Sequence, residues 1–155
     1  DVAAPRLERM LGLIDKGKNE GARVTTGGGR PAFDTGFFVD PTVFADVTND
    51  MTIAREEIFG PVLSVIAYDG VDDAVAIAND SPYGLSGSVW GADGAAAADI
   101  ARRMDTGTVT INHFGMAFGA PFGGYKDSGL GRELGPEGVD AYLQKKSISL
   151  DPAAG

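Results

Sequence analysis

Residues 62–111 read VLSVIAYDGVDDAVAIANDSPYGLSGSVWGADGAAAADIARRMDTGTVTI and carry the pattern that decides the fold. Residues 62–68 form a continuous apolar run with β-branched side chains, which is typical of a strand buried on both faces. Residues 71–79 and 95–104 have apolar side chains at helical spacing. Residues 85–90 and 108–111 are short strand candidates. The order strand, helix, strand, helix, strand predicts the α/β class with a parallel βαβαβ core.

The segment before this core has weaker patterns. Residues 5–21 place apolar side chains at the spacing of one helical face, and Pro5 and Gly21 suit the two ends of that helix. The apolar side chains are Leu7, Met10, Leu11 and Ile14. Short extended segments are expected at residues 22–26 and 36–44. The glycines between them lie in GGGRPA, which lacks the spacing of a dinucleotide-binding fingerprint and is expected to be a plain loop.

The end of the core and the segment after it also carry signals. Gly107 is expected to stop the second helix, because glycine accepts the left-handed backbone of a helix C-terminus. Residues 133–143 are expected to form a helix that opens at Arg132 and Glu133. Residues 147–150 are expected to form a short strand.

Composition excludes several classes of function. The chain has 155 residues, a net charge of −9 and a pI near 4.4, so no nucleic-acid partner is expected. No apolar run reaches the roughly 20 residues of a membrane helix, and the N-terminal residues lack the pattern of a signal peptide. We therefore expect a cytoplasmic protein that does not associate with a membrane. With no cysteine and a single histidine, His113, no metal site is expected.

The stretch EEIFGPV, residues 56–62, combines carboxylates with an aromatic ring immediately before a turn. An ionised carboxylate at Glu57 can accept both hydroxyl protons of a ribose, and the ring of Phe59 offers a flat apolar face for a nicotinamide. The alternative is that Glu56 and Glu57 are solvated and that Phe59 fills the core.

Residues 112–122 leave the last strand of the core, where parallel sheets place their ligands. Their aromatic and sulfur-containing side chains predict either the wall of a pocket or a cap on the sheet. His113 could act as a general base, but without a recognisable nucleophile it is expected to be a hydrogen-bonded loop residue.

The stretch PFGGYKDSGLGRE, residues 121–133, is rich in glycine and ends on a charged pair. Together with EEIFGPV it resembles the C-terminal part of the aldehyde dehydrogenase superfamily. Weaker similarities in NDSPYGLSGSVW, residues 79–90, and GTVTIN, residues 107–112, occur in the expected order. The resemblance therefore covers nearly the whole chain.

This resemblance implies an NAD or NADP cofactor and roles for four residues. Glu57 would bind the nicotinamide ribose, Phe59 would pack near the nicotinamide ring, and Phe122 would line the aldehyde channel through its place in PFGG. Glu133 would lie near the catalytic centre as a proton relay; its alternative role is a carboxylate favoured by a helix dipole. Superfamily members oxidise an aldehyde to a carboxylic acid through a cysteine thioester. Because this chain has no cysteine, we expect it to be an inactive fragment by itself.

Two other functions remain open. In the superfamily a C-terminal strand joins a partner subunit, and Lys146 to Leu150 match that position, so the chain could be an oligomerisation or binding module in a homo-oligomer. The resemblance implies that residues 1–145 are the C-terminal portion of the catalytic domain and that residues 146–155 are the oligomerisation strand and tail. The third hypothesis is an acid–base pair made by Glu57 and Glu133.

Overall fold

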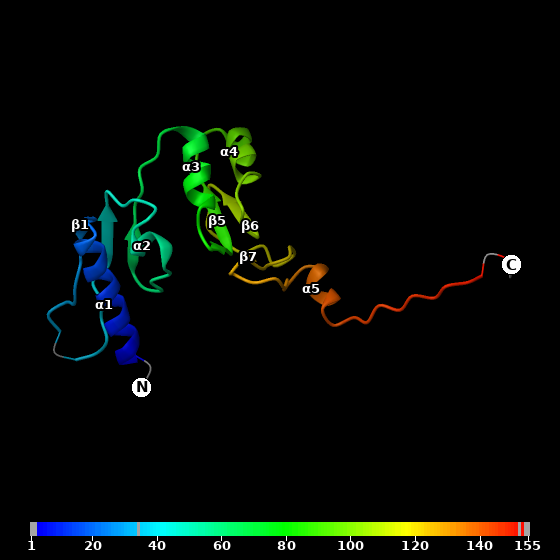
Figure 1. The fold of residues 1–155 in the computed structure, drawn as a ribbon, viewed down its shortest axis with the longest axis horizontal. Helices are drawn as coiled ribbons and strands as arrows, with labels where there is room; N and C mark the ends of the chain where they lie inside the picture. Colours follow the sequence, from blue (N-terminus) through cyan, green and yellow to red (C-terminus); the bar gives the residue numbers. More distant parts are fainter. Residues whose placement is uncertain (1–2, 34, 152, 154–155) are drawn as a thin grey trace. The chain divides into compact units, whose positions relative to one another are not determined.

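The computed structural model describes residues 3–33, 35–151 and 153 (Figure 1). The chain divides between Ser81 and Pro82 into two compact units, which we call the N-terminal and C-terminal units and describe separately. Within the described ranges, no helix combines the length and the apolar content that crossing a membrane requires.

Among its described residues, the N-terminal unit contains three helices and one three-stranded sheet. The helices are α1 (Ala3–Asn19), α2 (Thr52–Arg55) and α3 (Gly70–Asn79), and the strands are β1 (Arg23–Thr26), β2 (Thr42–Ala45) and β3 (Val62–Ser64). The central strand β2 pairs antiparallel with β1 and parallel with β3, in a register that places Phe44 opposite Ser64. The expected helix at the N-terminus, the strand that follows it and the first helix of the core are confirmed.

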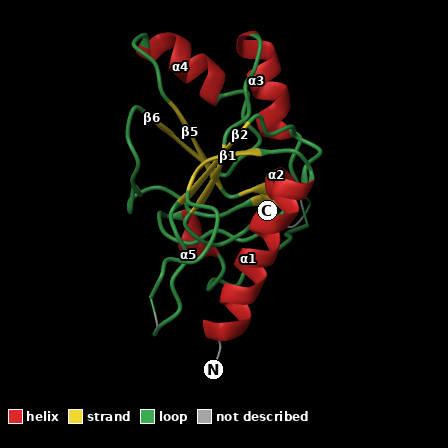
Figure 2. Cartoon of the chain, turned by 90° about the vertical axis from the view of Figure 1, so that its left-hand side faces the viewer, coloured by secondary structure: helices red, strands yellow, loops and turns green. Residues whose placement is uncertain are grey.

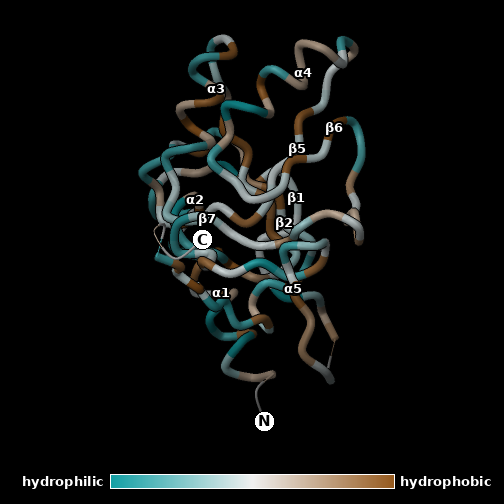
Figure 3. Tube along the Cα trace, turned by 90° about the vertical axis from the view of Figure 1, so that its right-hand side faces the viewer, coloured by the Kyte–Doolittle hydropathy of each residue, from teal (hydrophilic) through white to brown (hydrophobic). Residues whose placement is uncertain are grey.

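The hydrophobic core of this unit lies between α1, β2 and the segment around α2. Its buried members, among the residues that the structure describes, are Leu13, Ile14, Ala22, Phe44, Val47, Ile53 and Ile58. Figure 2 shows the short helix α2 beside the long helix α1. Gly17 allows this approach, because a Cβ there would lie 2.8 Å from Cδ1 of Ile53. Polar and apolar stretches alternate along α1 in Figure 3, as expected for a helix that buries one face.

The C-terminal unit is built around a strand–helix–strand element. Strand β5 (Ser86–Val89) pairs parallel with β6 (Thr108–Ile111), and helix α4 (Gly94–Ala101) connects them. Asp93 caps α4, since its Oδ1 accepts hydrogen bonds from the backbone N–H groups of Ala95 and Ala96 at 2.9 and 3.1 Å. Strands β4 (Tyr83–Gly84) and β7 (Tyr125–Lys126) form an antiparallel pair, and the short helix α5 (Glu137–Asp140) follows.

The α/β class with parallel strands is confirmed, but three details of the predicted core differ. The parallel pairs β2–β3 and β5–β6 belong to different sheets, whereas the element order predicted one sheet. The strand expected at residues 62–68 ends at Ser64 and lies at the edge of the sheet; Leu63 is 59% exposed, so the strand is not buried on both faces. Helix α4 ends at Ala101, and Gly107 is absent from the glycines with positive φ, so Gly107 does not form the C-terminus of that helix.

In the C-terminal segment the expected helix is shorter than predicted and the expected strand is absent from residues 147–150. The helix predicted at residues 133–143 is limited to α5, because Leu134 and Gly135 have φ values of 59° and 60° in the left-handed region. The strand predicted at residues 147–150 is not formed; these residues run as an extended trace, red in Figure 1. Part of the predicted tail, residues 152, 154 and 155, lies outside the described residues.

Candidate functional site

The segment Glu56–Gly60 connects α2 to β3 in the N-terminal unit. Ile58 is buried in the core, while its neighbours Glu57 and Phe59 are exposed. Phe59 is 67% exposed and has a φ of 56°. The alternative in which Phe59 fills the core is therefore wrong, since Ile58 has that position. The structure leaves the Glu57 carboxylate and the Phe59 ring accessible to a ligand.

Helix α1 holds this segment from one side through two arginines. The guanidinium of Arg9 donates hydrogen bonds to the carbonyl oxygens of Glu57 at 2.8 Å and Ile58 at 3.1 Å. The guanidinium of Arg6 lies over the Phe59 ring, 4.8 Å from its centroid. Sequence reasoning missed both residues. Their separation of three positions indicates only a shared helix face, and gives no sign of what that face contacts.

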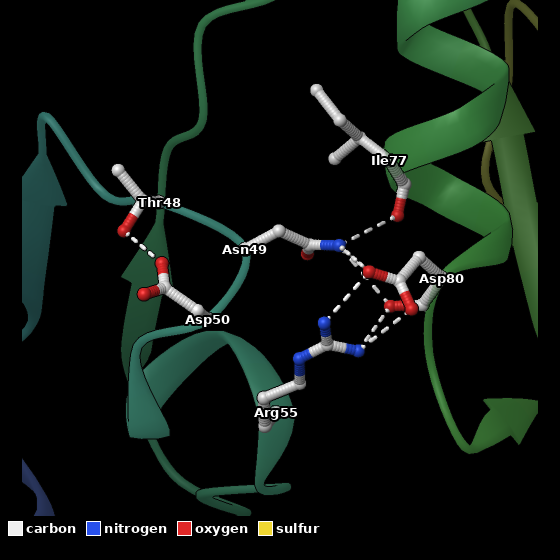
Figure 4. Close-up of polar contacts among 6 residues, drawn as sticks. All are labelled: Thr48, Asn49, Asp50, Arg55, Ile77 and Asp80. Atoms are coloured by element: carbon white, nitrogen blue, oxygen red, sulfur yellow. Dashed lines mark hydrogen bonds and ion pairs between the residues drawn. The ribbon is translucent and has the colours of Figure 1, made fainter.

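The N-terminal end of the same segment is held by a polar network between α2 and α3 (Figure 4). Arg55, the last residue of α2, donates through Nη2 and Nη1 to the two carboxylate oxygens of Asp80 at 2.6 and 3.0 Å. These hydrogen bonds raise the pKa of Arg55 above its ordinary value. Asn49 Nδ2 donates to the same carboxylate at 2.9 Å. The two parallel hydrogen bonds between Arg55 and Asp80 form the bidentate geometry that arginine–carboxylate pairs favour.

The opposite end of α2 is held by an acidic side chain from the end of α1. Glu20 accepts hydrogen bonds from the backbone N–H of Thr52 at 2.7 Å and from its hydroxyl at 2.6 Å. These bonds to the ionised form lower the pKa of Glu20. Asp50 likewise has a lowered pKa, because it accepts a hydrogen bond from the Thr48 hydroxyl at 2.5 Å.

The glycine-rich stretch Pro121–Glu133 forms a closed loop in the C-terminal unit. Phe122 and Glu133 pair as an isolated antiparallel bridge, with both N–H···O distances 2.7 Å. Inside the loop, Arg132 Nη1 donates to the carbonyl oxygens of Gly124 at 3.0 Å and Gly131 at 2.8 Å. The bridge replaces the predicted helix start at Glu133, so the reading of Glu133 as a first-turn carboxylate is wrong. Glu133 is exposed and Phe122 is half-buried.

Two hollows lie next to this loop, and Phe122 lines both of them. The first, of about 640 Å³, is bordered by the glycine-rich loop, by Glu133 and by Tyr142 beyond α5. The second, of about 470 Å³, is more apolar and is bordered by β5, β6 and the side chains of Phe114 and Met116. Phe114 is 95% exposed, so it does not cap the sheet. This geometry favours the pocket-wall interpretation of the loop at residues 112–122.

His113 takes no part in either hollow. It is exposed, its Nδ1 lies 3.2 Å from the carbonyl oxygen of Ile111, and its own carbonyl oxygen accepts a hydrogen bond from the Thr110 hydroxyl at 2.7 Å. These contacts fit the hydrogen-bonded loop residue that the sequence predicts. Across the part of the chain that the structure describes, no three His, Cys, Asp or Glu side chains are grouped so that they could hold a metal ion.

The four predicted site residues form two pairs. Glu57 and Phe59 lie together in the N-terminal unit, and Phe122 and Glu133 are hydrogen-bonded in the C-terminal unit. The acid–base pair of Glu57 and Glu133 stays a prediction, because the two residues belong to different units.

Comparison with known proteins connects both halves to one family. Residues 2–148 match the model of the aldehyde dehydrogenase family. A geranial dehydrogenase of Castellaniella defragrans is 61% identical over 149 residues, which are 96% of this chain and 31% of that protein.

Solved structures similar to this chain are also aldehyde dehydrogenases. An aldehyde dehydrogenase of Mycobacterium tuberculosis complexed with NAD+ is 57% identical, with a TM-score of 0.91, over 95% of this chain and 31% of that chain. A mutant aldehyde dehydrogenase of Pseudomonas syringae, complexed with NAD+ and octanal, is 49% identical with a TM-score of 0.89, over 93% of this chain and 30% of that one. The chain thus spans about 30% of the length of such relatives. It belongs to the aldehyde dehydrogenase family of oxidoreductases.

Proposed function

We propose that this chain supplies the C-terminal part of an NAD(P)-dependent aldehyde dehydrogenase that oxidises an aldehyde to a carboxylic acid. The observation that carries the proposal is the segment Glu56–Gly60, whose backbone is hydrogen-bonded to Arg9. It exposes the Glu57 carboxylate and the Phe59 ring on either side of buried Ile58. Family membership and the NAD+ complexes of the similar solved structures support it.

The exposed side chains fit the nicotinamide end of such a cofactor. The Glu57 carboxylate can accept hydrogen bonds from both ribose hydroxyls, because an ionised carboxylate has only acceptor sites. The Phe59 ring provides a flat apolar surface for the nicotinamide, with Arg6 already in contact with the ring. When bound, the cofactor supplies the acceptor for the hydride that leaves the substrate.

The C-terminal unit carries its own hollow, which we propose binds the aldehyde. The hollow lined by Phe114, Met116 and Phe122 offers an apolar surface for a hydrocarbon chain. Octanal and geranial, the aldehydes in the names of two similar proteins, are suitable test substrates. Glu133 borders the neighbouring hollow and would hold or move a proton between the site and water.

The nucleophile has to come from outside this chain. The family mechanism that we propose uses a cysteine thiolate that forms a thioester with the substrate, and the chain contains no cysteine. Serine or threonine cannot replace it without a positioned base. We therefore propose that the 155-residue chain has no dehydrogenase activity by itself, and that the full-length polypeptide containing it is active.

The test is aldehyde-dependent NADH formation, followed by absorbance, with octanal and geranial as substrates. The full-length polypeptide should turn over, and the 155-residue chain should not. Robust turnover by the chain alone would contradict the requirement for an external thiolate. In the full-length protein, Glu57→Gln and Phe59→Ala should raise KM for NAD+ or NADP+, whereas Phe122→Ala should raise KM for the aldehyde.

A second candidate function, assembly through Lys146–Leu150, is favoured by the exposure of that segment. Ile148 and Leu150 are 80% and 83% exposed and alternate with polar residues. This alternation is typical of a strand whose apolar face packs against a partner. We propose that this segment adds to a second subunit in a homo-oligomer. Light scattering at increasing protein concentration tests this: a strict monomer would contradict it, and a dimer that Ile148→Asp abolishes would support it.

A further inference from the structure

Arg9 makes a two-point contact with the backbone of the Glu57–Phe59 segment. Its Nη2 donates to the Glu57 carbonyl oxygen at 2.8 Å and its Nη1 to the Ile58 carbonyl oxygen at 3.1 Å, while the Glu56 carboxylate lies 3.8 Å away. A planar guanidinium can reach two neighbouring acceptors at once, which a lysine ammonium on a flexible stem cannot do with the same geometry. The contact therefore fixes the orientation of the two peptide groups.

Arg6 adds a contact to the side chain that follows. It precedes Arg9 by three positions, so both arginines occupy one face of α1, and its guanidinium lies 4.8 Å from the centroid of the Phe59 ring. Phe59 has a φ of 56°, which is uncommon for a residue with a Cβ. Such a conformation persists only where the surroundings hold it. Arg9, Arg6 and buried Ile58 provide those surroundings.

We propose that Arg9 is a positioning residue for the nicotinamide end of the site. It acts through the backbone of Glu57 and Ile58, and so directs the Glu57 carboxylate and the Phe59 ring, with Arg6 as the second contact. The role rests on the proposed dehydrogenase function. Its structural part, that the ring position depends on Arg9, can be measured without any cofactor.

The first experiment is NMR spectroscopy of the 155-residue chain. Protons on the Arg6 side chain above the Phe59 ring should have upfield ring-current shifts. Arg9→Met should abolish these shifts and Arg9→Lys should reduce them, while Arg23→Met should leave them unchanged, because Arg23 pairs instead with Asp46. Retention of the shifts in Arg9→Met would overturn the proposal. Resonances of buried Phe44 report on folding. If Arg9→Met does not fold, Arg9→Lys decides: reduced shifts support the proposal and unchanged shifts overturn it.

The second experiment measures steady-state kinetics of the full-length polypeptide. Arg9→Met should raise KM for NAD+ about tenfold, as expected from losing charge-assisted hydrogen bonds that orient a binding group. KM for the aldehyde should not change, and Arg9→Lys should restore part of the cofactor affinity. A merely structural role would lower the amount of active enzyme and leave both KM values unchanged, which would overturn the proposal. Absence of aldehyde oxidation in the wild-type protein would instead contradict the proposed function, and the NMR result would still stand.

Discussion

Phe122 and Glu133 exchange two backbone hydrogen bonds of 2.7 Å, one from each N–H to the other residue's carbonyl oxygen. The pair closes the glycine-rich loop and brings together two residues for which the sequence predicts different roles, one in substrate binding and one in proton transfer. Because the link is through the backbone, the side chain of either residue can be changed without removing it.

The Phe122–Glu133 pair separates a structural from a chemical role of Glu133. Glu133→Gln keeps both backbone hydrogen bonds and changes an exposed side chain, so the free energy of unfolding should change by less than about 0.5 kcal/mol. Glu133→Pro removes the donor to the Phe122 carbonyl oxygen and should lower it by about 1–3 kcal/mol. Denaturant unfolding of the 155-residue chain measures both. Equal stability of the two variants would contradict the structural importance of the bridge.

Phe44 is the centre of the core in the N-terminal unit. Its side chain is fully buried, with 0% exposure. Phe44→Ala should lower the free energy of unfolding by about 3–5 kcal/mol, because it removes buried apolar area and leaves a cavity. Phe37→Ala, at a position that is 51% exposed, is the matched control and should have a much smaller effect. Urea unfolding followed by circular dichroism distinguishes the two.

Gly107 is required by a close backbone approach. A Cβ at this position would lie 1.7 Å from the carbonyl oxygen of Gly123, so the two backbones could not keep their distance. Gly107→Ala should destabilise the C-terminal unit by about 1–3 kcal/mol, the usual effect of overpacking. Gly91→Ala is the control, since a Cβ at Gly91 would meet nothing within 4 Å. A thermal melt in which Gly107→Ala matches Gly91→Ala would refute the prediction.

The carboxylate of Glu20 should make the stability of the N-terminal unit depend on acid pH. Its pKa in the folded chain is lowered from the ordinary value of 4.5 by the hydrogen bonds from Thr52. The stabilisation is therefore complete above pH 4.5 and is lost as the pH falls through the lowered folded value, because the unfolded chain binds the proton first.

A comparison of wild type with Glu20→Gln measures this contribution. The difference in free energy of unfolding between the two proteins should be larger at neutral pH than in acid, and should decrease as the pH falls through the lowered pKa of Glu20. Glu8→Gln, on an exposed position of α1, is the control. A difference that does not change with pH would show that the Glu20 contact with Thr52 does not depend on charge.

Local patterns in the sequence predicted the elements whose residues depend mainly on their neighbours. The helical face of α1, the acidic first turn of α3 and the β-branched strand β6 follow from spacings within a few residues, and their positions are confirmed. The motifs at residues 56–62 and 121–133 likewise indicated the family, which the comparisons confirm. The failures occur where a distant partner decides the conformation. The expected helix at residues 133–143 is shortened to α5, because Glu133 pairs with Phe122 and the backbone turns left-handed at Leu134.

By itself, then, the sequence determined the α/β class and the family, and it supplied the residues that we propose for a nicotinamide and an aldehyde. Only the tertiary structure decided that β3 is an edge strand, that Ile58 rather than Phe59 enters the core, and that Arg9 holds the Glu57 backbone across a separation of 48 residues. The physical reason is that spacing along a chain specifies which side chains share a face. What that face contacts depends on packing and hydrogen bonds between residues far apart in the sequence, which local patterns do not encode.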